Sequence, residues 1–313
     1  MTRLVIRRLL LAIPLVFAVS FITFVLVALT PGNPAVDLLG TSAGKAAYAA
    51  VDRQLGFDHS IWVQYWHWLE HAVQGNLGVS LLNQESVVTE LAQRLPVTLA
   101  LVIGATLVAA IGGVALGTLS ATHGGIAGRS TDVFAMLGFA IPTFWLGIVL
   151  VDLFAVHGHL LPATGWVPLG QSLWGWIKSL LLPVVTLAAG GITAVTKQTR
   201  DAMREALSRE FIDALRADGV PEWRVVYIHA LRNAAIPILT LLGTIFVGLL
   251  GGAVIVEQVF TLPGLGSLAV SATQAHDLPV VEGIAVYFAL GVVAVNLVVD
   301  LLYGWVNPKV RLT

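Results

Sequence analysis

Long apolar runs dominate this sequence and exclude an ordinary soluble fold. The first run, from Leu9 to Leu29, has 21 residues, which is enough to cross a hydrocarbon core roughly 30 Å thick. Hydrophobic residues make up 57% of the chain and charged residues 11%, whereas about 25% charge is typical of soluble domains. We therefore expect an all-α, polytopic membrane protein with six transmembrane helices, over residues 9–29, 96–120, 131–156, 178–196, 238–256 and 280–303.

The first apolar run is expected to remain as a transmembrane helix within residues 1–30. Three arginines precede it, as in a secretory signal peptide, but the apolar region of such a peptide has about 7 to 15 residues and ends at a small-residue cleavage site. Neither condition holds here. Residues 31–95 then form the longest extramembrane segment. Its aromatic cluster suits the headgroup region of a membrane and consists of Trp62, Tyr65, Trp66 and Trp68.

The stretch from Lys197 to Arg232 is a charged island, with seven basic and six acidic residues. Gly219 can end a helix there in the left-handed conformation, and Pro221 suits the first turn of another. We therefore expect a helix, a tight turn and a second helix outside the bilayer. The apolar residues of the first helix recur at intervals of three or four, as on one helical face: Met203, Leu207, Phe211, Ala214 and Leu215.

Basic residues are distributed unevenly between the two sides of the membrane. On the six-helix topology, 13 of the 17 Lys and Arg residues lie on the side of the N-terminus and four on the opposite side. The positive-inside rule then places both termini and the charged island in the cytoplasm. Residues 31–95 are expected to be extracytoplasmic.

The charged island also carries a recognisable motif. Asp213-Ala214-Leu215, followed after three residues by Gly219, resembles the EAA loop of permease subunits of ABC importers. Asp213 and Leu215 replace the Glu and the second Ala of the usual pattern.

The following stretch is similar to one branch of that family. HALRNAAIP, from His229 to Pro237, resembles the dipeptide, oligopeptide and nickel permeases, with His229 and Arg232 where the general loop pattern has Ile and Pro. The segments GNLGVSL and LPATGW and the C-terminal residues 300–311 resemble the same branch. The similarity therefore extends over nearly the whole chain.

This resemblance implies a type I ABC importer permease in the bacterial inner membrane. Its parts would be an N-terminal helix (1–30), the extracytoplasmic segment (31–95) and a five-helix core (96–313), whose loop 197–238 contacts the ATPases. The implied partners are membrane lipid, a second homologous permease, two cytoplasmic ABC ATPases and an extracytoplasmic solute-binding protein. The implied coupling residues are Asp213, Ala214, Leu215, Gly219, His229 and Arg232.

The resemblance implies di- and oligopeptides as substrates, with nickel chelates, glutathione and haem as alternatives. No catalytic residue, metal ligand or cofactor is expected in this chain. Residues 40–46 look like a phosphate-binding loop, but the segment is one residue too short and lacks the Ser or Thr that would hold magnesium. ATP and Mg²⁺ are therefore expected in the partner ATPases. The net charge of -1 and the absence of a basic run give no indication of nucleic acid.

Ionisable groups inside a membrane are costly and often functional. Asp152 in the third span is a candidate for the substrate pathway, with a structural hydrogen bond as the alternative. Trp145, near Pro142, and Asn296, one helical turn before Asp300, are further candidates. The sequence shows no chain of buried carboxylates for a proton relay, so a proton-coupled carrier is the weaker hypothesis.

One motif favours an enzyme instead. His67-Trp-Leu-Glu70-His71 matches H-x-x-E-H, a zinc-binding helical pattern, and leaves a membrane metallopeptidase as an alternative. Such a site needs a third ligand and a water-filled cleft, whereas this segment lies among interfacial tryptophans. A solvated helix face is the simpler interpretation.

Overall fold

The computed structural model describes residues 2–306, except 31–33, 41, 55, 57, 124–132, 134–137 and 139. Within these residues the regular structure is helical, apart from an isolated bridge between Val79 and Ser86. The chain divides into two units, and the long helices α5 (Val87–Thr122) and α13 (Leu278–Val306) contribute to both. Unit 1 contains residues 98–262 and 295–313, and unit 2 contains residues 2–97 and 263–294.

Five of the described helices are long and apolar enough to cross a membrane, and they confirm five of the predicted spans. They cover Ile6–Leu29, Val87–Thr122, Leu173–Leu207, Glu222–Val259 and Leu278–Leu302. The helix that contains the second span is longer than the span itself, because α5 begins at Val87 and continues through Pro96.

The third predicted span, residues 131–156, is not one continuous helix. Pro142 has the extended angles φ -60° and ψ 133°, so the helix is interrupted there. A shorter apolar helix follows, formed by α7 (Thr143–Val151) and the π-helix η1 (Asp152–His157). Residues 131, 132, 134–137 and 139 lie outside the described part. Proline's missing N–H and its ring explain the interruption.

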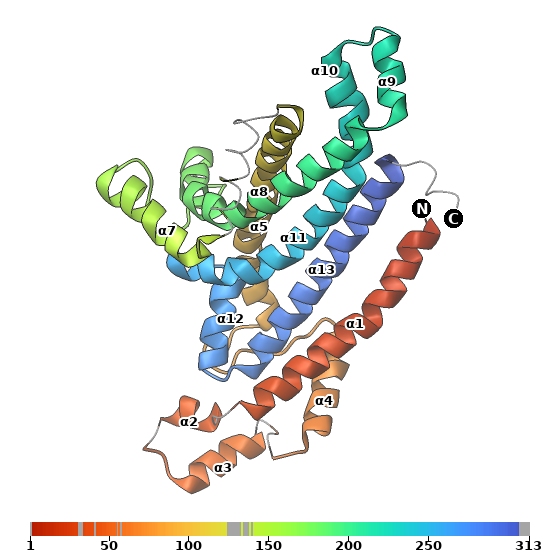
Figure 1. Cartoon of the computed structure of the whole chain (residues 1–313). Coiled ribbons are helices and arrows are strands. Elements are labelled where there is room, and N and C mark those ends of the chain that lie inside the picture. The colour runs from red at the N-terminus through yellow and green to blue at the C-terminus, as the bar shows by residue number, and fades with distance from the viewer. Residues whose placement is uncertain are drawn as a thin grey trace. The chain divides into compact units, whose positions relative to one another are not determined.

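Unit 1 is built around α8 (Leu173–Leu207) and α11 (Leu231–Val259), which lie side by side, with α7 packed on both (Figure 1). Two glycines of α5, Gly113 and Gly117, allow α8 to approach closely. A Cβ atom added at Gly113 would lie 2.5 Å from Val195 Cβ, and one at Gly117 would lie 2.6 Å from the Thr196 carbonyl oxygen. Only glycine fits at these two contacts.

Unit 2 contains α1 (Thr2–Leu29), three short helices, the start of α5, α12 (Leu265–Gln274) and the first part of α13. The short helices are α2 (Pro34–Leu39), α3 (Lys45–Gln54) and α4 (Ile61–Val73). Buried residues of α5, α12 and α13, among them Leu91, Leu265 and Val280, form its apolar core. The carboxylate of Asp277 fixes the loop before α5, because it accepts hydrogen bonds from Ser80 Oγ (2.5 Å) and Leu81 N (3.2 Å).

Candidate functional site

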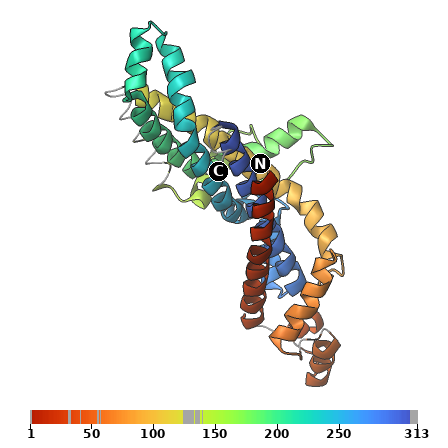
Figure 2. The ribbon, with the colours of Figure 1, turned by 90° about the vertical axis from the view of Figure 1, so that its right-hand side faces the viewer.

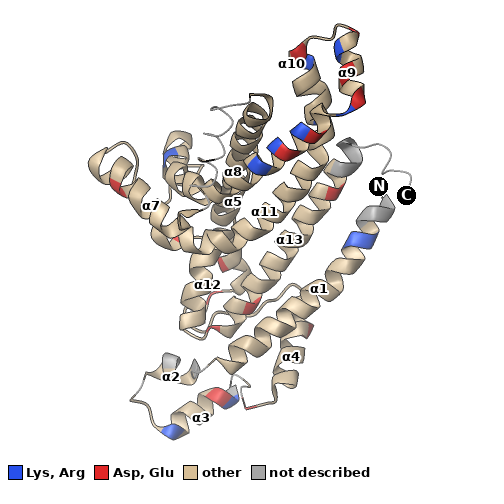
Figure 3. Cartoon of the chain, viewed as in Figure 1, with Lys and Arg blue, Asp and Glu red and all other residues tan. Residues whose placement is uncertain are grey.

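The charged island projects beyond the ends of α8 and α11 as a helical hairpin. It consists of α9 (Glu210–Ala217), a turn, α10 (Glu222–Arg224) and the π-helix η2 (Val225–Ala230), which continues into α11. Figure 1 and Figure 2 show this hairpin at one end of the helix pair. Figure 3 shows charged residues gathered on it and on the adjoining end of α8, whereas α11 carries only Arg232 and Glu257, near its two ends. The charged residues of unit 1 are thus concentrated at the hairpin end.

The prediction of one continuous helix through Met203 and Leu215 is wrong. α8 ends at Leu207, and Arg209 has the extended angles φ -84° and ψ 143° before α9 begins. The Ser208 hydroxyl donates a 2.9 Å hydrogen bond to the Glu205 carbonyl oxygen, and such local bonds compete with the helical ones. The break lets α9 turn back over α8.

The turn at Gly219 has the predicted left-handed conformation, with φ +76°. Gly219 N donates to Arg216 O, and Val220 N donates to Leu215 O, each at 3.0 Å. This pair of bonds is the Schellman motif, which satisfies the last carbonyl groups of a helix. Leu215 and Val220 pack on the same apolar cluster, as the motif requires. Pro221 directly precedes α10.

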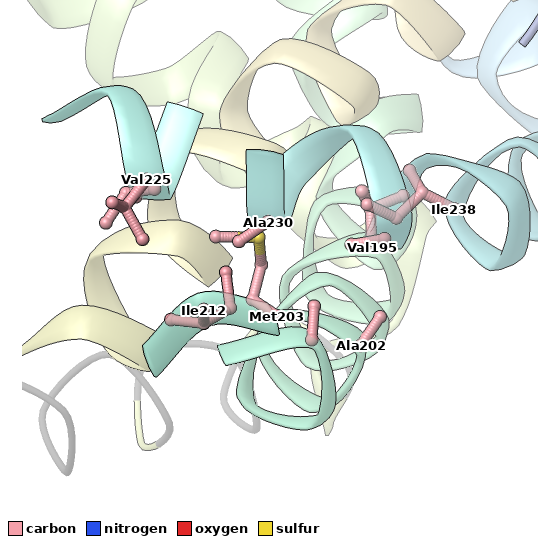
Figure 4. Packing of buried hydrophobic residues seen from close by; sticks show 10 residues of the cluster. Val195, Ala202, Met203, Ile212, Val225, Ala230 and Ile238 are labelled. Atoms are coloured by element: carbon pink, nitrogen blue, oxygen red, sulfur yellow. The ribbon is translucent and has the colours of Figure 1, made fainter. Parts of the chain in front are cut away.

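A buried apolar cluster attaches this hairpin to the long helices (Figure 4). Met203 of α8, Ile212 of α9, Val225 and Ala230 of η2 each have 0% of their surface exposed. Ile238 of α11 extends the cluster. Burying such side chains stabilises by about 1.5–3 kcal/mol each, so α9 is held rigidly to α8 and α11. A force on the hairpin would therefore reach both long helices.

An ion pair closes the hairpin across its turn. Arg216 Nη2 lies 2.7 Å from Glu222 Oε1, and Arg216 Nε lies 3.1 Å from Glu222 Oε2. The hydrogen bond between them raises the pKa of Arg216 and lowers the pKa of Glu222. Asp213 Oδ1 lies 3.8 Å from Arg216 Nη1. Arg216 and Glu222 are both largely exposed, so their ion pair fixes the geometry of the turn more than it stabilises the fold.

The structure places five of the six predicted coupling residues on the hairpin and Arg232 at the start of α11, in different environments. Asp213, Ala214, Gly219 and Arg232 are exposed, whereas Leu215 and His229 are half-buried. The His229 carbonyl oxygen accepts a 2.9 Å hydrogen bond from Asn233. The predicted coupling residues therefore include both exposed and half-buried positions.

Sequence reasoning missed the exposed apolar residues of this hairpin. Trp223 is 56% exposed, Tyr227 61% and Ile228 46%. Trp223 and Tyr227 are four residues apart and share a helical face. The four-residue spacing of these two aromatic residues within a polar segment was the sequence signal that could have identified this exposed face. Large exposed apolar side chains rimmed by charges are typical of a protein contact surface.

The three candidates for a substrate pathway lie on different parts of unit 1. Trp145 and Asp152 are exposed on α7 and η1, and Asn296 is half-buried on α13. Asp152 Oδ1 lies 3.3 Å from His157 Nδ1. Among the described residues, no hydrogen bond or ion pair joins these three side chains, and their role stays a prediction.

The pentad from His67 to His71 forms one turn of α4. His71 Nδ1 lies 2.7 Å from the His67 carbonyl oxygen, so this ring nitrogen is engaged within the helix. In the described part of the chain, no three His, Cys, Asp or Glu side chains are grouped so that they could hold a metal ion. The geometry gives the metallopeptidase alternative no support.

Comparison with known proteins covers nearly the whole sequence. Residues 113–312 match the family model described as binding-protein-dependent transport system inner membrane component, and residues 1–102 match the model of its N-terminal region. A peptide transport system permease protein of Brucella abortus (strain 2308) is 38% identical over 312 residues, 99% of each chain. The glutathione transport system permease protein GsiC of Escherichia coli (strain K12) is 37% identical over 313 residues, again 99% of each.

One solved structure shares the fold. A chain of the MetNI methionine ABC transporter, in inward-facing conformations, superposes with a TM-score of 0.55 at 17% sequence identity. The match covers 70% of this chain and 97% of the other. At this identity it supports the fold alone.

Proposed function

Because the chain belongs to the family of binding-protein-dependent transport system inner membrane components, we propose that it is the permease subunit of an ATP-driven peptide importer. It is a multi-pass protein of the bacterial inner membrane with the type I ABC importer permease fold. Its task is transport, and ATP is hydrolysed by partner subunits.

The complete importer contains four further components in this proposal: a second homologous permease, two cytoplasmic ATPases and an extracytoplasmic solute-binding protein. The hairpin from Glu210 to Ala230 faces the cytoplasm, where 13 of the 17 basic residues would lie. Residues 31–95 lie on the extracytoplasmic side.

The hairpin is the contact through which the ATPases drive transport. The observation that carries this role is the buried attachment of Ile212 and Met203 beneath a surface that exposes Trp223 and Tyr227. ATPase closure would move the exposed face, and the buried cluster would transmit that movement to α8 and α11. Alternating access requires such a rigid connection to an element with two arrangements.

The substrate class rests on the relatives. The Brucella abortus protein is named for peptide transport and the Escherichia coli protein for glutathione, itself a small peptide. We propose di- or oligopeptides, with glutathione as the second candidate. Uptake of labelled dipeptide and of labelled glutathione into proteoliposomes containing the whole importer would separate the two.

Cysteine cross-linking tests the contact and the orientation together. The chain contains no cysteine, so a single introduced thiol is unique within it. Tyr227→Cys should cross-link to an ATPase subunit and stay protected from a membrane-impermeant thiol reagent in intact spheroplasts. Ala46→Cys, which replaces an exposed residue of α3, should be labelled and should not cross-link. The reverse labelling pattern would contradict the proposed orientation.

A further inference from the structure

The helix α4 packs against the membrane helix α1 (Figure 1). Tyr65 is 3% exposed, and its hydroxyl lies 2.9 Å from Ser20 Oγ. Its ring meets those of Phe17, Phe21 and Phe24 edge-on, with centroids 5.2–5.8 Å apart. Trp62 stacks on Phe21 at 5.1 Å. This contact is built from aromatic rings of both helices.

The contact lies well inside the apolar run of α1. Phe21 precedes Leu29, the last residue of α1, by eight positions, which corresponds to about 12 Å along the helix axis. The hydrocarbon core is roughly 30 Å thick. On the orientation proposed above, α4 is therefore embedded in the outer leaflet and does not rest on the headgroups.

An open apolar groove of about 470 Å³ runs beside this contact. Phe17 and Phe21 of α1 line one side, and Trp62, Val63 and Trp66 of α4 line the other. Trp62 is 70% and Trp66 59% exposed. At this depth in a membrane, a groove of apolar side chains is filled by hydrocarbon.

A hollow of about 510 Å³, lined by basic and apolar residues, shares the residue His67 with the groove. Arg53, His59 and His71 line it, and no carboxylate side chain of the described residues does so. Phe24 lines it from α1, closer to the proposed outer end of the helix than Phe17 and Phe21. The hollow is therefore suited to an anionic group located above an acyl chain.

From this arrangement we infer that α1, α3 and α4 form a binding site for one anionic phospholipid of the outer leaflet. One acyl chain lies in the groove between Phe21 and Val63, and the phosphate group lies in the hollow beside Arg53. The continuity of groove and hollow favours a lipid over a free anion, which would use the hollow alone. The bound lipid would hold α4 in contact with α1.

Native mass spectrometry of the full-length protein tests this site. The protein is reconstituted in vesicles of equal phosphatidylglycerol and phosphatidylcholine and transferred to detergent, and the retained lipid is counted. Phosphatidylglycerol should be retained in excess. Arg53→Gln should lower its retention about fivefold, which corresponds to about 1 kcal/mol for one basic group near an anionic surface. Val63→Trp, which fills the groove, should lower retention of both lipids.

Matched controls keep the result specific. Lys178→Gln removes a positive charge that does not line the hollow, and Val73→Trp adds the same bulk to α4 outside the groove; both should retain lipid as the wild type does. If Arg53→Gln and Val63→Trp behave like these controls, the site is refuted. Displacement by millimolar inorganic phosphate would also refute it, because a free anion would then suffice. Since uptake is not measured, failure here leaves the proposed transport function intact.

Discussion

Arg216 and Glu222 are joined by two hydrogen bonds, of 2.7 Å and 3.1 Å, across the turn at Gly219. The pair links the end of α9 to the start of α10 and so sets the angle between the two arms of the hairpin. The bond from Arg216 lowers the pKa of Glu222 below its ordinary value of 4.5, so the carboxylate stays charged further into acid solution than a free glutamate. This ionised pair therefore helps to define the geometry of the proposed ATPase contact.

This pair predicts a dependence on acid pH. Because the pKa of Glu222 is lowered in the folded turn, the ion pair stabilises the turn at pH values above the ordinary pKa of 4.5. This contribution is lost as the pH falls through the lowered pKa. Hydrogen exchange of the Val220 amide, corrected for its intrinsic rate, should therefore accelerate as the pH falls below about 4.5. The change should be small because both side chains are exposed. Glu222→Gln should show no such transition, and an identical profile for wild type and variant would contradict the prediction.

Gly219 is expected to be essential for its backbone conformation alone. A Cβ atom added there would meet nothing within 4 Å, but φ +76° costs an L-residue about 1–2 kcal/mol. Gly219→Val should leave the protein in the membrane and reduce substrate uptake about 5- to 30-fold if that strain displaces the contact with the ATPases. ATP hydrolysis should continue without uptake.

Gly219→Asn is the matched control, because asparagine tolerates the left-handed conformation. It should retain most of the uptake. Equal losses in the two variants would show that the glycine matters for some reason other than its positive φ.

Local sequence patterns were sufficient to predict the transmembrane spans and the turn at Gly219. Hydropathy over about 20 residues depends on no distant contact, and it predicted the five long helices. The Gly219 and Pro221 pair likewise encodes a helix end within a few residues. Motifs along the chain also led to the correct family, because they recur at their expected places between the spans.

Tertiary contacts explain what local patterns could not predict. The periodic apolar residues of the island suit one long helix as well as two short ones, and the break at Arg209 places Ile212 in a cluster with Val225 and Ala230. Aromatic residues on α4 are equally compatible with an interfacial helix. The bond from Tyr65 to Ser20, 45 positions earlier, and the ring contacts with Phe17, Phe21 and Phe24 show that it packs on α1.

Gly117 should be the least replaceable glycine of α5. A Cβ atom there would lie 2.5 Å from Thr199 Cβ and 2.6 Å from the Thr196 carbonyl oxygen, and a backbone atom cannot move aside alone. Gly117→Ala should destabilise the protein by about 1–3 kcal/mol through this overlap. Gly248→Ala is the control, since its Cβ would meet nothing within 4 Å. Thermal unfolding in detergent should separate the two, and equal melting temperatures would contradict the close packing of α5 on α8.

Thr98 and Glu257 form a buried contact within unit 1 that should contribute measurably to stability. Thr98 Oγ1 donates a 2.6 Å hydrogen bond to Glu257 Oε1, and the two residues are 1% and 0% exposed. Thr98→Val keeps the shape but removes the donor, which should cost about 1–3 kcal/mol because the buried carboxylate loses one of its hydrogen bonds.

A second variant distinguishes this loss from a packing defect. When both partners become apolar, no acceptor is left without its donor, so Thr98→Val combined with Glu257→Met should recover much of the stability. Thr98→Ser should stay close to wild type, since its hydroxyl can still donate. Thermal unfolding of the wild type, Thr98→Val, Glu257→Met and the double variant forms a double-mutant cycle, in which a coupling well above the roughly 0.3–0.5 kcal/mol scatter of independent sites is expected. Strictly additive effects would show that the hydrogen bond does not carry the contact between α5 and α11.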